Sequence, residues 1–185
     1  ACGICGSDLH TYRHGMFQEV LGIPVDSGCI LGHEFSGEVA EICGEVAGVK
    51  VGDRVVTVSR GANAEYVKIG PEEIELLMPF DESVSFVEAA NTEPLGTSLH
   101  AVNLADPRDG EIHVIMGAGI IGLGVLQCIK ARSSAKTVVI DLSDKRLAKA
   151  TDLGADLTLN ASDRDIVLLM LGPGLLGLDV PLAGN

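Results

Sequence analysis

Aromatic and basic residues are scarce in the 185-residue chain, and each shortage argues against a class of partner. Aromatic side chains make up 3% of the sequence and tryptophan is absent, so the stacking surfaces that hold single-stranded nucleic acid are not expected. Lysine and arginine together number 13 against 26 acidic residues, for a formal net charge of −13. Binding to a phosphate backbone needs basic patches, and we therefore expect no nucleic-acid partner.

The sequence also lacks a disulfide pattern and an apolar run of membrane-spanning length. Its five cysteines are an odd number without regular spacing, which is not typical of a disulfide framework. No stretch has the character of a transmembrane helix, and we recognise no signal peptide. We expect a protein of the reducing cytoplasm that has no membrane partner.

Glycine and apolar residues, by contrast, are abundant. With 23 glycines, 46% apolar residues and 21% charged residues, the chain has the composition of a folded protein. Its length allows one sizeable domain or two small ones. Two groups of residues, one near the start and one after residue 110, indicate chemistry.

A glycine motif follows a short apolar run within residues 114–124. Gly117, Gly119 and Gly122 fit the pattern G-x-G-x-x-G between an expected strand and an expected helix. Such glycines permit a tight turn, close approach of a diphosphate and close helix–strand packing, with the diphosphate at the helix N-terminus. A second apolar run ends in Asp141, 19 residues after Gly122, where a carboxylate can accept from ribose hydroxyls. This context favours a dinucleotide site over an ordinary glycine turn.

Potential metal ligands gather near the start of the chain. One group is Cys5-Gly-Ser-Asp-Leu-His10 and the other is Gly32-His-Glu34. A thiolate and an imidazole are good zinc ligands, and a carboxylate can complete a tetrahedral set. Glu93 precedes Pro94 in a mostly apolar neighbourhood, where a buried acid needs a partner such as a metal or its water. The alternative is a buried thiol with surface histidines, and the combination favours the metal site.

Residues 35–69 have the pattern of short strands. Residues 35–42 are largely apolar, residues 49–51 and 54–58 flank the turn residues Gly52-Asp53, and residues 64–69 alternate. We expect a small barrel or sandwich.

The rest of the chain alternates between helical and strand patterns. Residues 85–102 are expected to be helical with a break near Pro94, because proline disrupts a helix interior. After the glycine motif, Ser143 is expected to cap a helix that runs to Leu153 and stops at Gly154, followed by a strand at residues 157–159. A further helix at residues 165–171 and a fourth strand at 176–182 complete a parallel β-α-β arrangement.

Taken together, these motifs resemble the zinc-dependent medium-chain alcohol/polyol dehydrogenase family, and they follow the family's order over nearly the whole chain. The Glu-Pro-Leu element is similar to the sorbitol, threonine and butanediol dehydrogenase branch. The resemblance implies an α/β fold with a partial GroES-like, β-rich catalytic domain over residues 1–95 and a truncated Rossmann domain over residues 96–185. The motifs are Cys2-Gly-Ile-Cys5-Gly-Ser-Asp-Leu-His10, Gly32-His-Glu-Phe-Ser-Gly37, Val51-Gly-Asp-Arg-Val55, Ala64-Glu-Tyr-Val67, Glu93-Pro-Leu95 and Gly117-Ala-Gly-Ile-Ile-Gly122.

The resemblance also implies roles for single residues around one catalytic zinc. Cys5 and His33 match zinc ligands. Glu34 and Glu93 match carboxylates that bind the metal directly or through its water, and which of them is the ligand stays open. Asp8 matches the group that orients His33 and makes it a better ligand.

The remaining implied roles concern the proton and the cofactor. Ser7 and His10 match a relay that carries the alcohol proton to solvent. Asp141 favours NAD over NADP, because a carboxylate would repel the extra phosphate. The implied cofactor contacts are Gly117, Gly119, Ile120, Ile121, Gly122, Asp141 and Arg146.

The resemblance implies the activity of a zinc- and NAD-dependent dehydrogenase (EC 1.1.1.-) that acts on a small alcohol or polyol. It also implies a homo-oligomer, either a dimer or a tetramer. The family's four-cysteine lobe is missing between Thr57 and Ala64, so we expect no structural zinc. The family also has strands before the first zinc cysteine and beyond the fourth Rossmann strand. The sequence is therefore that of a shortened relative or part of a longer chain.

Two rival functions stay open at this point. One is a zinc-independent quinone or enone reductase with the same folds, although that chemistry has no use for the metal ligands. The other is a non-catalytic remnant that binds only a dinucleotide or a partner.

Overall fold

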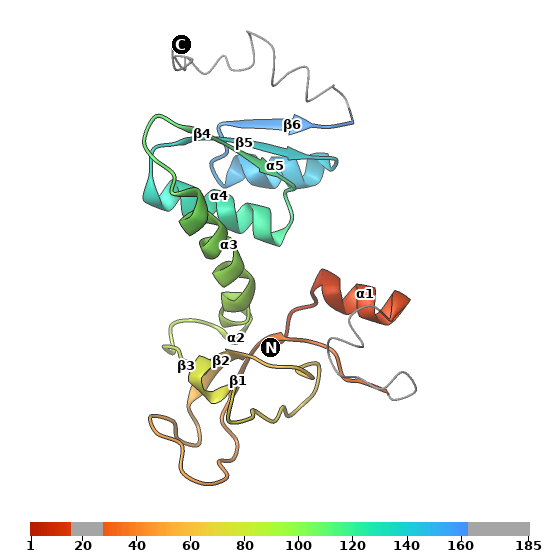
Figure 1. Ribbon diagram of the computed structural model, residues 1–185, viewed down its shortest axis with the longest axis vertical. Helices are drawn as coiled ribbons and strands as arrows, with labels where there is room; N and C mark the ends of the chain where they lie inside the picture. Colours follow the sequence, from red (N-terminus) through yellow and green to blue (C-terminus); the bar gives the residue numbers. More distant parts are fainter. Residues whose placement is uncertain (16–27, 163–185) are drawn as a thin grey trace. The chain divides into compact units, whose positions relative to one another are not determined.

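Two short sheets of opposite type organise the computed structural model, which describes residues 1–15 and 28–162. The chain divides into two units between Glu93 and Pro94, and each unit is described by itself. Among the described residues, each unit holds one three-stranded sheet, antiparallel in the first and parallel in the second (Figure 1). The helix expected at residues 165–171 and the strand expected at 176–182 lie outside the described residues.

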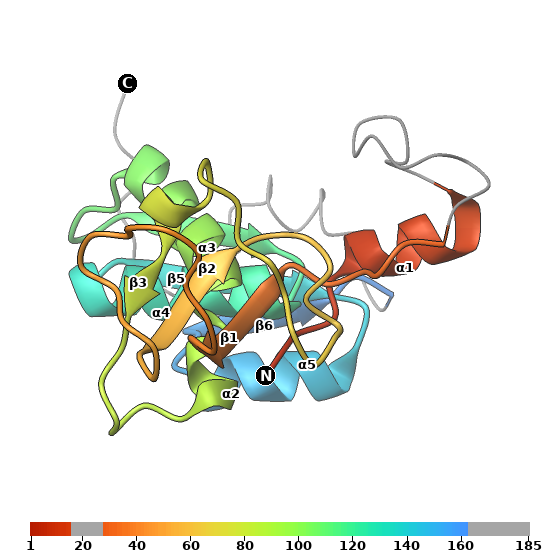
Figure 2. The same ribbon diagram turned by 90° about the horizontal axis from the view of Figure 1, so that it is seen from below.

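The antiparallel sheet has β1 at its edge, β2 in the middle and β3 beyond it. Side by side in Figure 2, β1 and β2 pair from Glu34 opposite Val58 to Glu38 opposite Arg54. The first residues of the chain lie along the other side of β1, where Gly3 N–H donates to the Glu34 carbonyl at 2.7 Å. The strands are β1 (Glu34–Glu38), β2 (Arg54–Val58) and β3 (Met78–Pro79).

Two strand predictions in this unit were wrong. Residues 49–51 do not pair with β2, because the turn at Gly52 closes onto the end of β1 instead: Gly52 N–H donates to the Val39 carbonyl at 2.8 Å, and Val39 N–H donates to the Asp53 carbonyl at 2.9 Å. Residues 64–69 are irregular, and β3 occupies the position beside β2. The apolar run at 35–42 forms a strand only as far as Glu38.

Short helices flank this sheet, and one of them is tied directly to β1. Ser85 begins α2 with a capping box, in which its hydroxyl accepts from Glu88 N–H at 3.2 Å and its N–H donates to the Glu88 carboxylate at 2.8 Å. The Ser36 hydroxyl on β1 donates to the Phe86 carbonyl at 2.5 Å. The helical elements are α1 (Gly6–His14), a 3₁₀ turn η1 (Ile74–Leu76) and α2 (Phe86–Ala89).

The second unit has the parallel β-α-β arrangement that the sequence predicts. Its sheet has the order β4-β5-β6, and α4 and α5 lie on the same face of it (Figure 1). Ile115 and Val139 face that layer and pack with Leu126, Ile129 and Leu147 in one buried core. The elements are α3 (Thr92–Ala105), β4 (Ile112–Met116), α4 (Ile120–Arg132), β5 (Lys136–Asp141), α5 (Asp144–Asp152) and β6 (Leu157–Asn160).

The helix boundaries agree with the sequence in most places. The expected break near Pro94 is confirmed, because α2 ends at Ala89 and α3 begins at Thr92, so that the proline falls in the first helical turn, where a missing N–H is tolerated. Ser143 is the N-cap residue of α5, as expected, but its hydroxyl makes no hydrogen bond to the helix. Within the described part of the chain, no helix is long and apolar enough to span a bilayer.

A half-buried acid joins the N-terminal ends of β5 and β6 to α4. Asp156, just before β6, pairs with Lys130 of α4 and with Lys136 at 3.2 Å, and it accepts from Thr137 N–H at 2.7 Å. Burial alone would raise the pKa of Asp156, but the hydrogen bonds from Lys130, Thr137 and Lys136 outweigh it and hold that pKa well below its usual range. The carboxylate therefore stabilises the folded state in its charged form.

Replacing this acid should give a pH-dependent loss of stability. We expect Asp156→Asn to lower the free energy of unfolding by about 2 kcal/mol at pH 7, because Lys130 keeps its partial burial but loses its charged partner. A depressed folded-state pKa gives stability above the unfolded value of 3.8 that is lost as pH falls further, so the gap to wild type should narrow between pH 5 and pH 2. Urea unfolding across that range measures it, with Asp152→Asn, an exposed acid, as control. Equal stability of the two proteins at pH 7 would contradict this role.

Candidate metal centre and dinucleotide loop

The start of α1 holds Cys5 through the carboxylate of Asp8. Cys5 occupies the N-cap position, with extended backbone angles, and its N–H donates to Asp8 Oδ2 at 2.8 Å. Asp8 is only 6% exposed, so its carboxylate depends on such backbone donors for compensation. The cap therefore fixes both the thiol and the buried acid beside it.

The other oxygen of Asp8 reaches the segment that leads into β1. Asp8 Oδ1 accepts from Gly32 N–H at 3.1 Å and lies 3.5 Å from His33 Nδ1. Gly32 has a φ of +96°, and a side chain there would collide with Asn63, so only glycine fits. One carboxylate thus connects two stretches that lie 24 residues apart in the sequence.

Three potential ligands converge at this junction. The ligand atoms of Cys5, His33 and Glu34 all lie within 4.8 Å of one another, and Glu34 is buried. Zinc–ligand bonds of about 2.0–2.3 Å require such atoms to lie a little closer together, so the trio can hold a divalent ion after a small inward movement. A thiol, an imidazole and a carboxylate fit zinc, and three protein ligands leave a fourth position for water or substrate.

Glu93 lies beside this trio but is not part of it. Burial raises the pKa of Glu93; His33 lowers it and the neighbouring carboxylate of Glu34 raises it further. The sequence left open whether Glu34 or Glu93 is the metal ligand, and the structure groups Glu34 with Cys5 and His33. A divalent cation here would favour the charged form of Glu93.

The two residues expected in the proton relay lie on α1, three positions apart and therefore on one face of the helix. Ser7 is half-buried, and its carbonyl accepts from the Thr11 hydroxyl at 2.9 Å. His10 is exposed, with its ring centroid 6.1 Å from that of His14. Ser7 is thus partly shielded from solvent, and His10 is in contact with it.

In the second unit, the glycine motif joins β4 to α4 in a tight turn. Gly117 has a φ of +99° and its N–H donates to the Ile140 carbonyl at 2.7 Å, while Gly119 is the N-cap of α4. A Cβ at Gly122 would overlap the carbonyl of Gly117, which confirms the close packing expected of the third glycine. The N-terminus of α4 therefore lies beside a loop whose backbone a diphosphate can approach.

Asp141 is tied to this loop by its own carboxylate. Oδ2 accepts from Ala118 N–H at 2.7 Å and Oδ1 accepts from Ser143 N–H at 2.8 Å. These two hydrogen bonds, with Arg146 at 3.8 Å, lower the pKa of Asp141. Sequence reasoning missed Ala118 and Ser143 because each acts through its backbone, although the position of Ala118 between two motif glycines is a usable signal.

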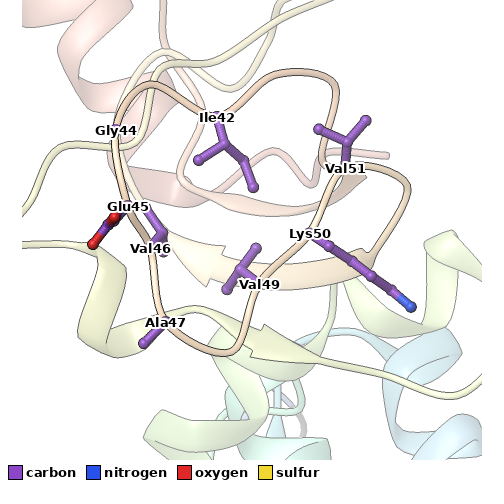
Figure 3. Close-up of a pocket in the computed structure, with 8 residues that line it drawn as sticks. All are labelled: Ile42, Gly44, Glu45, Val46, Ala47, Val49, Lys50 and Val51. Atoms are coloured by element: carbon purple, nitrogen blue, oxygen red, sulfur yellow. The ribbon is translucent and has the colours of Figure 1, made fainter.

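Two hollows in the described part of the first unit do not include the ligand trio. One, of about 630 Å³, is formed by the loop at residues 42–51 and has mostly apolar walls (Figure 3). A larger one, of about 1110 Å³, lies against β1 and β2 and the segment at residues 62–69. Neither is lined by Cys5, His33 or Glu34, so the chemistry of the side chains, and not the size of a hollow, identifies the site.

Comparison with known proteins relates the first unit to a family model and most of the chain to dehydrogenases. The family model described as the alcohol dehydrogenase GroES-like domain matches residues 1–93. The chain is similar to (R,R)-butanediol dehydrogenase of Bacillus subtilis (strain 168), with 32% identity over 90% of this chain and 56% of the relative. It is also similar to sorbitol dehydrogenase of Homo sapiens, with 35% identity over 86% of this chain and 51% of the relative.

The chain also shares its fold with solved structures, at a sequence identity similar to that of the relatives above. The crystal structure of 2R,3R-butanediol dehydrogenase from Bacillus subtilis has a TM-score of 0.75 and 33% identity, covering 91% of this chain and 56% of that chain. The chain thus spans about half the length of the curated relatives it matches.

The contact between Gly122 and Gly117 can be tested with a matched pair of helix glycines. We expect Gly122→Ala to lower the free energy of unfolding by about 2–3 kcal/mol, because the new methyl group pushes α4 away from the loop. Gly96→Ala in α3 meets open space and should be neutral or stabilising by up to about 1 kcal/mol. Thermal and urea unfolding of both variants measure this. If Gly122→Ala unfolds like wild type, the close approach is wrong.

Proposed function

Because the chain belongs to the zinc-dependent medium-chain alcohol/polyol dehydrogenase family, we propose that it transfers hydride between a secondary alcohol or polyol and a nicotinamide coenzyme. The observation that carries the proposal is the convergence of Cys5, His33 and Glu34. Residues 1–95 would form the catalytic domain and residues 96–185 the domain that binds the coenzyme. Relatives named butanediol and sorbitol dehydrogenases support a diol or polyol as substrate.

In this proposal Cys5, His33 and Glu34 hold one zinc ion, and Glu93 approaches it through a water molecule. When bound, zinc supplies a Lewis acid that makes an alcohol hydroxyl easier to deprotonate. Asp8 positions His33 through its 3.5 Å contact with Nδ1, and this fixes the ring so that the other nitrogen is free to bind a metal. The hydrogen bond from Cys5 N–H to Asp8 at the start of α1 holds the Cys5 backbone beside Asp8.

Ser7 and His10 are proposed to move the proton of the substrate hydroxyl to solvent. Their spacing on α1 allows a short relay, and the exposure of His10 gives it contact with water. An imidazole suits this role because it can take up a proton at one ring nitrogen and release one from the other.

The coenzyme is proposed to be NAD. The carboxylate of Asp141 would accept from the ribose hydroxyls and disfavour a phosphate at that position. Ile120 and Ile121 begin α4 between Gly119 and Gly122, and Arg146 of α5 lies near Asp141. These residues, with the three motif glycines, would form the contacts to the adenosine half.

A zinc-independent quinone or enone reductase explains the molecule less well. That chemistry gives no reason for a thiol, an imidazole and a buried carboxylate to converge. We further propose a cytoplasmic setting and a homo-oligomer. All five cysteines are free thiols, as expected of a reducing compartment.

The metal assignment predicts which variants lose zinc. We expect Cys5→Ala and Glu34→Gln to reduce bound zinc from about one equivalent to less than a tenth, because each removes one of three protein ligands. Glu93→Gln should retain most of the zinc. Cys43→Ala, which removes an exposed thiol, is the matched control. Elemental analysis after dialysis gives the zinc content, and NADH formation with 2,3-butanediol and sorbitol gives turnover. Cys5→Ala protein with wild-type zinc content and turnover would refute the assignment.

The coenzyme assignment predicts a change in preference at Asp141. We expect Asp141→Asn to weaken NADH binding about tenfold and to leave NADPH binding equal or stronger, because the charge that repels the extra phosphate is gone. Asparagine keeps an oxygen that can accept from Ala118 N–H, so the loop should persist. Fluorescence titration measures both affinities, with Asp152→Asn as control. An unchanged NADH to NADPH ratio would count against this role of Asp141.

A further inference from the structure

The turn after β5 carries Asp141 into α5, and little apolar burial holds it in place. Leu142 is 70% exposed, and Asp144, the first residue of α5, is also exposed. Polar contacts therefore hold the turn, among them the one from Ser143 N–H to Asp141. The neighbouring strand supplies another, since Asn160 ends β6 directly beside Asp141 in the parallel register.

The side chain of Asn160 connects three segments at this edge of the sheet. Its Nδ2 donates to Asp144 Oδ1 at 2.6 Å and, at a longer 3.4 Å, to the Leu142 carbonyl. Its Oδ1 accepts from Ser162 N–H at 2.9 Å. Both donor contacts end on the turn, and the acceptor contact holds the amide in the orientation that makes them possible.

Asn160 thus contacts the residue before Ser143 and the residue after it, Leu142 and Asp144. Ser143 N–H is the donor to Asp141 Oδ1 at 2.8 Å, so the position of Ser143 decides where that carboxylate oxygen lies. The residue after β6 adds a further link, since Ala161 N–H donates to the Asp141 carbonyl at 3.1 Å. The orientation of Asp141 therefore depends on Asn160 through the turn.

We propose that Asn160 is a positioning residue, which fixes the turn at residues 142–144 so that the carboxylate of Asp141 is presented to the ribose hydroxyls of the coenzyme. The inference rests on the proposed NAD specificity. Asn160 need not touch the coenzyme. It acts through Leu142, Asp144 and Ser143. Its loss should reduce the preference for NAD over NADP while leaving the melting temperature close to that of wild type.

Binding measurements on the full 185-residue chain test this. Fluorescence titrations with NADH and NADPH compare wild type, Asn160→Ala and the control Thr158→Ala, which changes the same strand two residues earlier. For Asn160→Ala we expect NADH binding to weaken at least fivefold and NADPH binding to stay within twofold. The melting temperature should change by no more than in the control. NADPH is spared because the carboxylate does not favour it in wild type.

Exchanging the amide and the carboxylate of the Asn160–Asp144 pair tests whether their hydrogen bond positions the turn. Asn160→Asp alone would set two carboxylates against each other and should weaken NADH binding at least as much as Asn160→Ala. Adding Asp144→Asn restores a donor and an acceptor between positions 160 and 144 with their roles exchanged, but not the longer contact to the Leu142 carbonyl, so NADH affinity should recover in part, to above that of either single variant. Loss and recovery of NADH affinity at a melting temperature that stays constant across these variants would not follow from a general loss of stability.

A second measurement does not depend on the coenzyme. The amide proton of Ser143, which donates to Asp141, should shift in ¹H–¹⁵N spectra of Asn160→Ala and return in the double variant. Wild-type NADH affinity in Asn160→Ala, an equal loss of NADH and NADPH binding, or an unmoved Ser143 amide would each overturn the proposal. If the wild-type chain binds neither coenzyme, the NAD proposal fails, and the Ser143 amide alone decides the role of Asn160.

Discussion

The carboxylate of Asp8 is the contact on which the candidate metal centre depends. Its two oxygens accept from Cys5 N–H at the start of α1 and from Gly32 N–H before β1, and it lies against His33. The thiol comes from a helix cap and the imidazole from a segment that begins a strand, so neither element places both ligands alone. A buried anion that needs several backbone donors forces the two segments together, because leaving those bonds unmade would cost about 1–3 kcal/mol each.

The second unit uses the same device at a different place. Asp141 at the end of β5 accepts from Ala118 N–H in the glycine loop and from Ser143 N–H before α5. In both units an acid at one end of a regular element accepts from loop N–H groups: Asp8 lies in the first turn of α1 and Asp141 is the last residue of β5. Loops lack the repeating hydrogen bonds of strands and helices, so a charged acceptor is an effective way to give them one conformation.

Much of this arrangement could be predicted from the sequence, and the failures have a common cause. The β-α-β order around Gly117–Gly122 and the strand ending in Asp141 follow from local patterns, because periodic apolar residues and glycines determine them over short distances. The strands expected at residues 49–51 and 64–69 failed, because pairing there is decided by distant partners: β1 and β3 occupy the two sides of β2. A short alternating run shows that a strand can form, but not which neighbour is free to accept it.

The choice between Glu34 and Glu93 was likewise beyond local reasoning, and the fold explains why. Both follow apolar or glycine-rich surroundings, and both are acids near a histidine in space. Glu34 begins β1, and its carbonyl accepts from Gly3 N–H. Because Gly3 has no side chain, the Glu34 carboxylate has room to lie beside Cys5. Glu93 instead lies in the first turn of α3, half-buried, with its pKa raised by burial and by Glu34. In the proposed site, a cation held by the trio would offset that repulsion, and Glu93 would lie beside it as a second carboxylate.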